Sequence, residues 1–203
     1  MFSFALVTLA LSAFASAFPA SVSIVDGLSR RSIVDCANPT QNAVITQAFS
    51  DAHQLATLAS AYITLYGASN PLFIAYWKTN SAASIKGYYD AILNETGTNK
   101  LYCHARSPDS CPGNNAYTVQ PSGNIYFCPP FYNLANQSDL CNSGSLPATR
   151  SGTMLHELGH AVNHRADISG SCSGSQSLSA ADAIENTTSF SCFARQVYRN
   201  TQC

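Results

Sequence analysis

The sequence predicts an α+β fold: a single helix-rich domain with a small antiparallel sheet and disulfides. Helical periodicity dominates both ends of the chain, whereas residues 101–128 contain short segments rich in aromatic and β-branched residues. Helices therefore precede and follow the strands instead of alternating with them, which is typical of α+β proteins. The chain has 203 residues, 46% of them hydrophobic, which suits one domain around one core.

The first two helices are predicted from apolar residues that recur at helical spacing. An Asn-Pro pair at residues 38–39 is suited to a helix start, the apolar stripe covers residues 45–66, and Gly67 is suited to the end. A second amphipathic stretch covers residues 85–93 and is expected to end near Gly97.

Three strands are predicted in the middle of the chain. Residues 101–105, 116–120 and 124–128 are rich in aromatic and β-branched residues, and Pro-Ser-Gly-Asn at residues 121–124 is a turn signal between the last two. We expect a small antiparallel sheet that nearby cysteines crosslink.

The last third of the chain is predicted to be helical again. Ser151 or Thr153 could cap a helix that runs to about residue 162. Residues 165–177, rich in serine and glycine, are expected to form a loop, and residues 178–199 one long helix. We find no internal repeat and no second domain.

The N-terminal residues are typical of a secreted protein. Residues 1–17 are apolar and end in Ala-Ser-Ala, a pattern typical of a signal peptide. The dibasic pair Arg30 and Arg31 predicts a short propeptide over residues 18–31, which leaves residues 32–203 as the folded domain. All eight cysteines lie in that domain, and an even number in a secreted chain indicates disulfides. We therefore expect an extracellular protein.

Charge and hydropathy exclude two classes of partner. The chain has 10 Lys and Arg residues, 11 Asp and Glu residues and a net charge of −1, so it lacks the basic excess that nucleic acid requires. No apolar run reaches the roughly 18 residues that span a bilayer. We expect neither a nucleic-acid nor a membrane partner, and we expect a monomer.

Residues 156–160 read His-Glu-Leu-Gly-His and carry the strongest chemical signal in the chain. His156 and His160 are four residues apart, so they share one face of a helix and can bind one zinc ion. Glu157 then lies beside the ion, where it can take a proton from a zinc-bound water that attacks a peptide carbonyl. Gly159 costs roughly 1 kcal/mol inside a helix relative to Ala, which is consistent with close packing there.

The spacing offers several candidates for the third protein ligand of this ion. His164 lies about 12 Å along the helix axis from His156, at ~1.5 Å per residue, so a straight helix cannot bring both to one ion. Asp167 follows the helix in a loop that can fold back, whereas Glu185, or Asp182 one turn away, would come from the last helix. Spacing alone leaves Asp167 and Glu185 as close alternatives.

The sequence resembles the deuterolysins, which are fungal secreted aspzincin metallopeptidases. The resemblance covers nearly all of residues 32–203. It rests on Gly-Thr-Met-Leu-His-Glu-Leu-Gly-His at residues 152–160, on the cysteine-flanked segments 109–111 and 125–129, and on the closing segment 178–194. It implies a zincin-like domain that binds one Zn²⁺ ion and cleaves peptide bonds in protein or peptide substrates.

The resemblance also implies a ligand set and a disulfide pattern. His156, His160 and Asp167 would bind zinc, and Glu157 would be the general base. The implied disulfides are Cys36–Cys103, Cys111–Cys128 and Cys141–Cys203, and the extra Cys172 and Cys192 would pair with each other.

The chain departs from the family pattern in its active-site loop. The Gly-Thr that precedes the ligand Asp in the family is missing, and the family's oxyanion-stabilising Tyr falls on Gly170. Tyr132 is a candidate to replace that Tyr. The Asp that gives lysine preference in some relatives falls on Thr188, so that specificity is not carried over. The alternative function is therefore a secreted zinc-binding or host-interaction protein that kept the fold and lost the chemistry.

Overall fold

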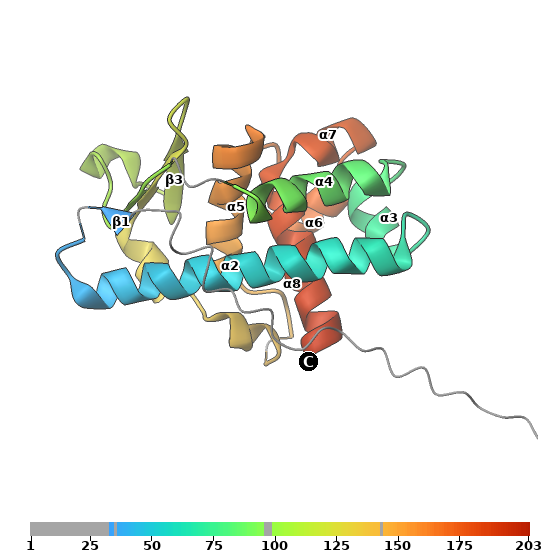
Figure 1. Ribbon diagram of the computed structural model, residues 1–203, viewed down its shortest axis with the longest axis horizontal. Coiled ribbons are helices and arrows are strands. Elements are labelled where there is room, and N and C mark those ends of the chain that lie inside the picture. Colours follow the sequence, from blue (N-terminus) through green and yellow to red (C-terminus); the bar gives the residue numbers. More distant parts are fainter. Residues whose placement is uncertain (1–32, 35, 96–98, 143) are drawn as a thin grey trace, which may run out of the picture.

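The structure is a computed structural model that describes residues 33–34, 36–95, 99–142 and 144–203. The predicted signal peptide (residues 1–17) and propeptide (residues 18–31) lie outside these residues. Within them, the chain forms a helical layer with a small sheet at one end, as Figure 1 shows. The predicted α+β class is confirmed.

Helix α2 (Pro39–Tyr66) spans the length of the helical layer. Its start and end agree with the prediction. The side chain of Asn38 accepts hydrogen bonds from the backbone N–H groups of Thr40 and Gln41, and Gly67 ends the helix at a φ of 65°. A positive φ costs little only for glycine, which explains why the helix ends at this residue.

Two further helices precede the sheet. Helix α3 (Pro71–Trp77) was not predicted, although Asn70 and Pro71 repeat the Asn-Pro start signal of α2. Helix α4 (Ala82–Leu93) is capped by Ser81 and corresponds to the predicted second helix. The expected end near Gly97 is outside the described residues.

The sheet is mixed rather than antiparallel, which corrects the prediction. Its order is β1 (Ile33–Val34), β2 (Leu101–Tyr102), β4 (Asn124–Phe127) and β3 (Ala116–Val119). Only the β3–β4 hairpin is antiparallel, whereas β1–β2 and β2–β4 are parallel. The reason is connectivity. Between β1 and β2 the chain returns through α2, α3 and α4, so β2 starts at the same end of the sheet as β1. Between β2 and β4 the chain returns through β3, so β4 also starts at that end.

The core lies between the longer helices: α2 packs against α4, α5 (Arg150–Asn163) and α8 (Thr187–Gln202), and α5 packs against α8. Helix α3 also packs against α8. The aromatic side chains Trp77, Phe190 and Phe193 lie at the centre, with ring centroids of Trp77 and Phe190 4.6 Å apart. The Tyr89 hydroxyl donates to the carbonyl oxygen of Phe190 at 2.8 Å. The buried rings hold α8 firmly against the rest of the domain.

The C-terminal third differs from the prediction at three places. Helix α5 (Arg150–Asn163) is capped by Thr149, not by Ser151 or Thr153. A short helix, α6 (Cys172–Gln176), lies within the expected loop. The expected long last helix is two helices, α7 (Ala180–Glu185) and α8 (Thr187–Gln202), separated at Asn186. Asn186 has extended backbone angles because its neighbours pair with the loop that follows α5.

The eight cysteines form four disulfides. Three are those that the resemblance implies, Cys36–Cys103, Cys111–Cys128 and Cys141–Cys203, and the two extra cysteines pair as expected, as Cys172–Cys192. Cys36–Cys103 and Cys141–Cys203 hold the two ends of the domain, and Cys172–Cys192 connects α6 to α8. Three 3₁₀ helices complete the described residues: Pro108–Ser110, Pro129–Asn133 and Gln137–Leu140. None of the described helices is both long and apolar enough to span a bilayer.

Candidate metal centre

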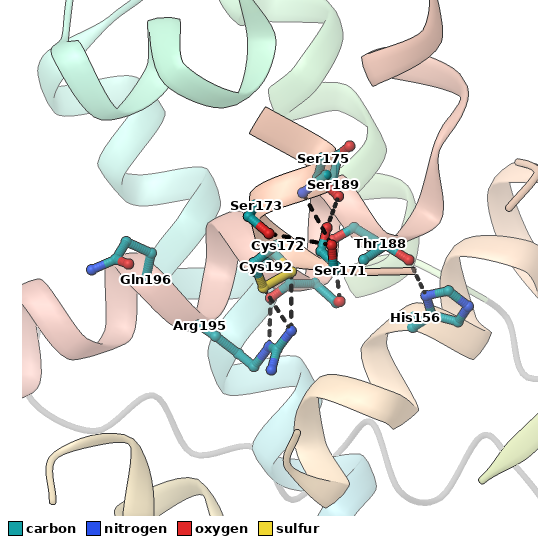
Figure 2. The surroundings of a disulfide bond; sticks show 12 residues. His156, Ser171, Cys172, Ser173, Ser175, Thr188, Ser189, Cys192, Arg195 and Gln196 are labelled. Carbon is teal, nitrogen blue, oxygen red and sulfur yellow. Dashed lines mark hydrogen bonds between the residues drawn. A yellow bond between two sulfur atoms is a disulfide. The ribbon is translucent and has the colours of Figure 1, made fainter. Parts of the chain in front are cut away.

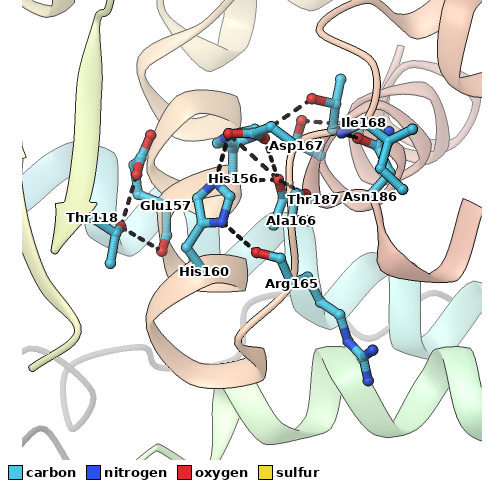
Figure 3. Close-up of polar contacts among 12 residues, drawn as sticks. Thr118, His156, Glu157, His160, Arg165, Ala166, Asp167, Ile168, Asn186 and Thr187 are labelled. Atoms are coloured by element: carbon cyan, nitrogen blue, oxygen red, sulfur yellow. Dashed lines mark hydrogen bonds and ion pairs between the residues drawn. The ribbon is translucent and has the colours of Figure 1, made fainter. Parts of the chain in front are cut away.

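Two imidazole rings on α5 lie with their Nε2 atoms next to each other. His156 and His160 lie one turn apart, with their Nε2 atoms 3.1 Å from each other (Figure 3). Both side chains are only partly exposed, at 20% and 16%. Two ring nitrogens at this separation can bind the same metal ion.

The carboxylate of Asp167 completes a cluster of three with these rings. Its Oδ1 lies 3.1 Å from Nε2 of His156, and its Oδ2 lies 3.1 Å from Nε2 of His160. The Thr187 hydroxyl donates to Oδ1 at 2.8 Å, so the carboxylate is held in one orientation. In the described part of the chain, this is the group of three His, Cys, Asp or Glu side chains whose donor atoms converge, all within 4.8 Å.

The break between α7 and α8 positions Asp167. The N–H of Ala166 donates to the carbonyl oxygen of Glu185 at 2.8 Å, and the N–H of Thr187 donates to the carbonyl oxygen of Ala166 at 3.0 Å. These two bonds form a short parallel bridge between the loop and the helix break (Figure 3). A continuous helix could not offer these groups, because its own ladder would use them.

Asn186 connects the break to the loop through its side chain, which is fully buried. Its Oδ1 accepts from the N–H groups of Ile168 and Ser169 at 2.9 and 3.0 Å. Its Nδ2 donates to the hydroxyls of Ser175 and Ser189. One buried amide therefore satisfies two backbone donors directly after Asp167.

We expect Asn186→Ala to lower the free energy of unfolding by about 1–3 kcal/mol, because two loop N–H groups and two hydroxyls lose the buried amide that they bond to. Denaturant unfolding of purified protein measures this. Asn200→Ala, on an exposed turn of the same helix, is the matched control and should change stability by less than about 0.5 kcal/mol. Equal stability of the two variants would contradict the role assigned to Asn186.

The second nitrogen of each ring has a partner that orients it. Nδ1 of His160 lies 2.6 Å from the carbonyl oxygen of Arg165, and Nδ1 of His156 lies 3.4 Å from the Thr188 hydroxyl. A carbonyl can only accept, so Nδ1 of His160 carries a proton, and Nε2 is the nitrogen left to bind a metal ion. Such partners fix the rings of metal-binding histidines.

Gly159 allows α5 and α8 to approach each other at the site. A Cβ atom at this position would lie 3.0 Å from Cγ2 of Thr187, which is closer than side chains normally pack. The close packing that the sequence indicated for Gly159 is therefore present. It brings Thr187 and Thr188 within reach of the two rings.

Glu157 lies beside the cluster and is buried, with 4% of its surface exposed. Its Oε2 accepts a hydrogen bond from the Thr118 hydroxyl of β3 at 2.8 Å (Figure 3). Burial raises the pKa of Glu157, while His156 and Thr118 act in the opposite direction. Thr118 has no motif around it, so the sequence alone offered no signal for this contact.

The side chains of the cluster shift one another's pKa values. Hydrogen bonds with His156 and then His160 hold the pKa of Asp167 well below its usual range. Burial lowers the pKa of His160, but the hydrogen bond with Asp167 and the field of Glu157 outweigh it, so the net shift is upward. The site therefore favours positive charge between the two rings and the carboxylate.

The donor set fits a zinc ion. Two neutral imidazoles and one carboxylate are the ligand types of catalytic zinc sites, in which a fourth position stays open. The other acidic candidate, Glu185, instead forms an ion pair with Arg165, and Asp182 accepts from Ser179. His164 lies at the left-handed end of α5 and is not part of the cluster.

A cavity of about 400 Å³ opens next to the cluster. His156, Glu157 and Asp167 line one part of it, and Gly170 lies along its wall without a side chain. Tyr132 does not line this cavity. Its hydroxyl donates to the carbonyl oxygen of Cys103 at 2.6 Å, and burial raises its pKa to about 12. The structure thus gives Tyr132 a structural contact rather than the predicted oxyanion role.

Comparisons with known proteins agree with this geometry. The chain is 30% identical to a neutral protease 2 homolog of Neosartorya fischeri, over 93% of the chain and 41% of that relative. It is 29% identical to neutral protease 2 homologs of Aspergillus fumigatus and Sclerotinia sclerotiorum, again over 93% of the chain and over 43% and 53% of the relatives. The chain thus spans about half or less of the length of these curated relatives.

The sequence model of the aspzincin family, described as "Lysine-specific metallo-endopeptidase", matches residues 63–195. The match covers more than half of the chain and includes α5, Asp167 and the first part of α8. The chain therefore belongs to the aspzincin family of metallo-endopeptidases.

Proposed function

We propose that this chain is a secreted, zinc-dependent endopeptidase that acts on proteins or peptides. One observation carries the proposal: two imidazoles and a carboxylate converge at the edge of a cavity, with a buried glutamate directly beside them. Membership of the aspzincin family supports a metal-dependent peptidase.

His156, His160 and Asp167 are the proposed ligands of one zinc ion. The ion, when bound, supplies a Lewis acid that lowers the pKa of water to about 7 and polarises a carbonyl oxygen. The ligand residues keep this acid fixed, because Thr187, Thr188 and the carbonyl of Arg165 hold their orientation.

Glu157 is the proposed general base and acid. Its carboxylate takes a proton from the attacking water as the oxygen bonds to the peptide carbonyl carbon. It then gives that proton to the leaving nitrogen as the carbon–nitrogen bond breaks. The hydrogen bond from Thr118 holds the carboxylate toward the cavity side of α5, and burial raises its pKa, so it can both accept and return a proton.

The proposed location of the protein is extracellular. Four disulfides are typical of proteins that fold in an oxidising compartment, which supports secretion after removal of residues 1–17. Removal of the propeptide at residues 18–31 would then leave the peptidase domain, residues 32–203.

The alternative function, a secreted zinc-binding protein without hydrolysis, rests on Gly170. This residue lines the cavity but offers no hydroxyl where the family resemblance predicts an oxyanion donor. Loss of one such donor typically lowers the rate by about 10²–10³-fold. The retained and oriented Glu157 favours the peptidase, because metal binding alone does not need this carboxylate.

Metal removal tests the proposal. We expect the purified protein to cleave casein, to lose this activity on treatment with a chelator, and to regain it when zinc is added back, because the site depends on the ion for its Lewis acid. Gel electrophoresis of the digests, with metal content measured in parallel, decides the result. Zinc binding at one ion per chain without chelator-sensitive cleavage would favour the alternative.

A further inference from the structure

Arg195 is a buried cation that lines the cavity next to the metal centre. It is on α8, two turns after Thr188, and is only 8% exposed, yet it lines the same cavity as His156 and Glu157. Figure 2 shows its guanidinium beside the disulfide Cys172–Cys192, on the side of α8 that faces α5. Nothing in the proposed metal chemistry uses this buried cation.

The partners of Arg195 carry no charge. Its Nε donates to the carbonyl oxygen of Ser191 at 3.3 Å, and Nη1 donates to that of Pro147 at 2.6 Å. Its Nη2 lies 3.2 and 3.1 Å from the sulfur atoms of Cys172 and Cys192, which are weak acceptors (Figure 2). A guanidinium has five N–H groups, so at least one is left without an acceptor in the described structure.

The charge of Arg195 is likewise unbalanced. Among the described residues, no Asp or Glu forms an ion pair with it. Burial lowers its pKa, but a guanidinium remains protonated at neutral pH. A buried charge without a counter-ion is costly, and an anion that binds beside it offsets part of this cost.

The chain makes room for this side chain. A Cβ atom at Gly152, one turn before His156 on α5, would lie 2.6 Å from Cδ and 2.9 Å from Nε of Arg195. Glycine at position 152 thus lets the guanidinium pass between α5 and α8. Thr188 and Ser191, which also line the cavity, leave polar space between it and the metal centre.

We propose that Arg195 forms a carboxylate-binding subsite that selects the substrate residue next to the scissile bond. The inference rests on the proposed peptidase function. The acids that line the cavity, Glu157 and Asp167, belong to the metal centre. Arg195 lies two helical turns beyond Thr188, so a substrate carboxylate that reaches this part of the cavity meets Arg195. The family is described as lysine-specific, but Arg195 would repel a lysine side chain in this cavity.

The carboxylate could belong to an Asp or Glu side chain or to the C-terminus of a short substrate. Matched peptides separate the two sources. One set places Glu, Gln or Lys in turn at each of the positions flanking the scissile bond, with both ends blocked. The peptides of a second set end at the residue that follows the scissile bond, and their C-terminus is either a free carboxylate or an amide.

For the wild-type protein we expect one position at which Glu is preferred over Gln by about 10- to 100-fold in kcat/KM, with Lys cleaved more slowly than Gln, because a charge-assisted hydrogen bond is gained. Arg195→Gln should abolish the Glu-over-Gln preference, and Arg195→Lys should retain part of it. Arg199→Gln, one turn further along α8, removes the same charge outside the cavity and should leave the ratio unchanged. Ratios within one variant are insensitive to partial loss of stability.

Failure of this inference and failure of the proposed function give different results. Cleavage of all peptides without a preference for the carboxylate overturns the subsite and leaves the peptidase standing. If none is cleaved, calorimetric titration of the zinc-loaded protein with the same peptides still decides, since tighter binding of the carboxylate member supports the subsite and equal binding overturns it. If Arg195 variants do not fold, the wild-type ratios alone decide.

Discussion

Glu157→Gln should reduce peptide hydrolysis by about 10²–10⁴-fold or more while leaving zinc bound, because the amide has nearly the same shape but cannot take a proton. The amide oxygen can still accept the hydrogen bond from Thr118, so the fold and the ligand residues His156 and His160 should be undisturbed. Initial rates on a quenched fluorescent peptide, with zinc content measured on the same samples, test both halves of the expectation.

Thr118→Val is the companion variant. It removes the hydroxyl that holds Glu157 but keeps the carboxylate, so hydrolysis should fall far less than in Glu157→Gln. Near-normal rates of peptide hydrolysis in Glu157→Gln would contradict the proposed mechanism. Loss of zinc from that variant would instead show that Glu157 is needed for the metal centre itself.

Asp167→Asn should weaken zinc binding by more than about 100-fold, which is the upper range for changes at residues that only support a metal ligand. The amide would replace an anionic donor that lies 3.1 Å from both ring nitrogens, and the centre would lose its one negative ligand. Competition with a chromophoric chelator measures the affinity. Activity should fall in parallel.

Glu185→Gln is the matched control, since it makes the same carboxylate-to-amide change at the rival position. Glu185 is about half exposed and pairs with Arg165, so this variant should keep its zinc and most of its stability. The opposite pattern, with zinc lost from Glu185→Gln and kept by Asp167→Asn, would assign the third ligand to Glu185.

Local patterns in the sequence were sufficient for the elements whose formation depends on neighbouring residues. Helix α2 begins after Asn38 and ends before Gly67, because an Asn side chain caps the first turn and a glycine accepts a positive φ. His156 and His160 share one face for the same kind of reason, because helical spacing decides it. These features require no knowledge of the rest of the fold.

The direction of the strands and the break at Asn186 could not be predicted in this way. Parallel pairing of β2 with β1 and β4 results from the path of the chain through helices and a hairpin. The segment 178–199 has helical periodicity throughout, yet Asn186 is extended, because its buried amide and its neighbours bond to the loop after α5. Long-range hydrogen bonds outweighed local propensity there.

By itself, therefore, the sequence determined the helix that bears His156, Glu157 and His160, since these depend on spacing along one chain segment. Only the tertiary structure decided that Asp167 rather than Glu185 meets the two rings, and that Arg195 reaches the same cavity. The physical reason is that both outcomes depend on how α8 and the loop after α5 pack together. That packing is set by buried contacts between residues far apart in the chain.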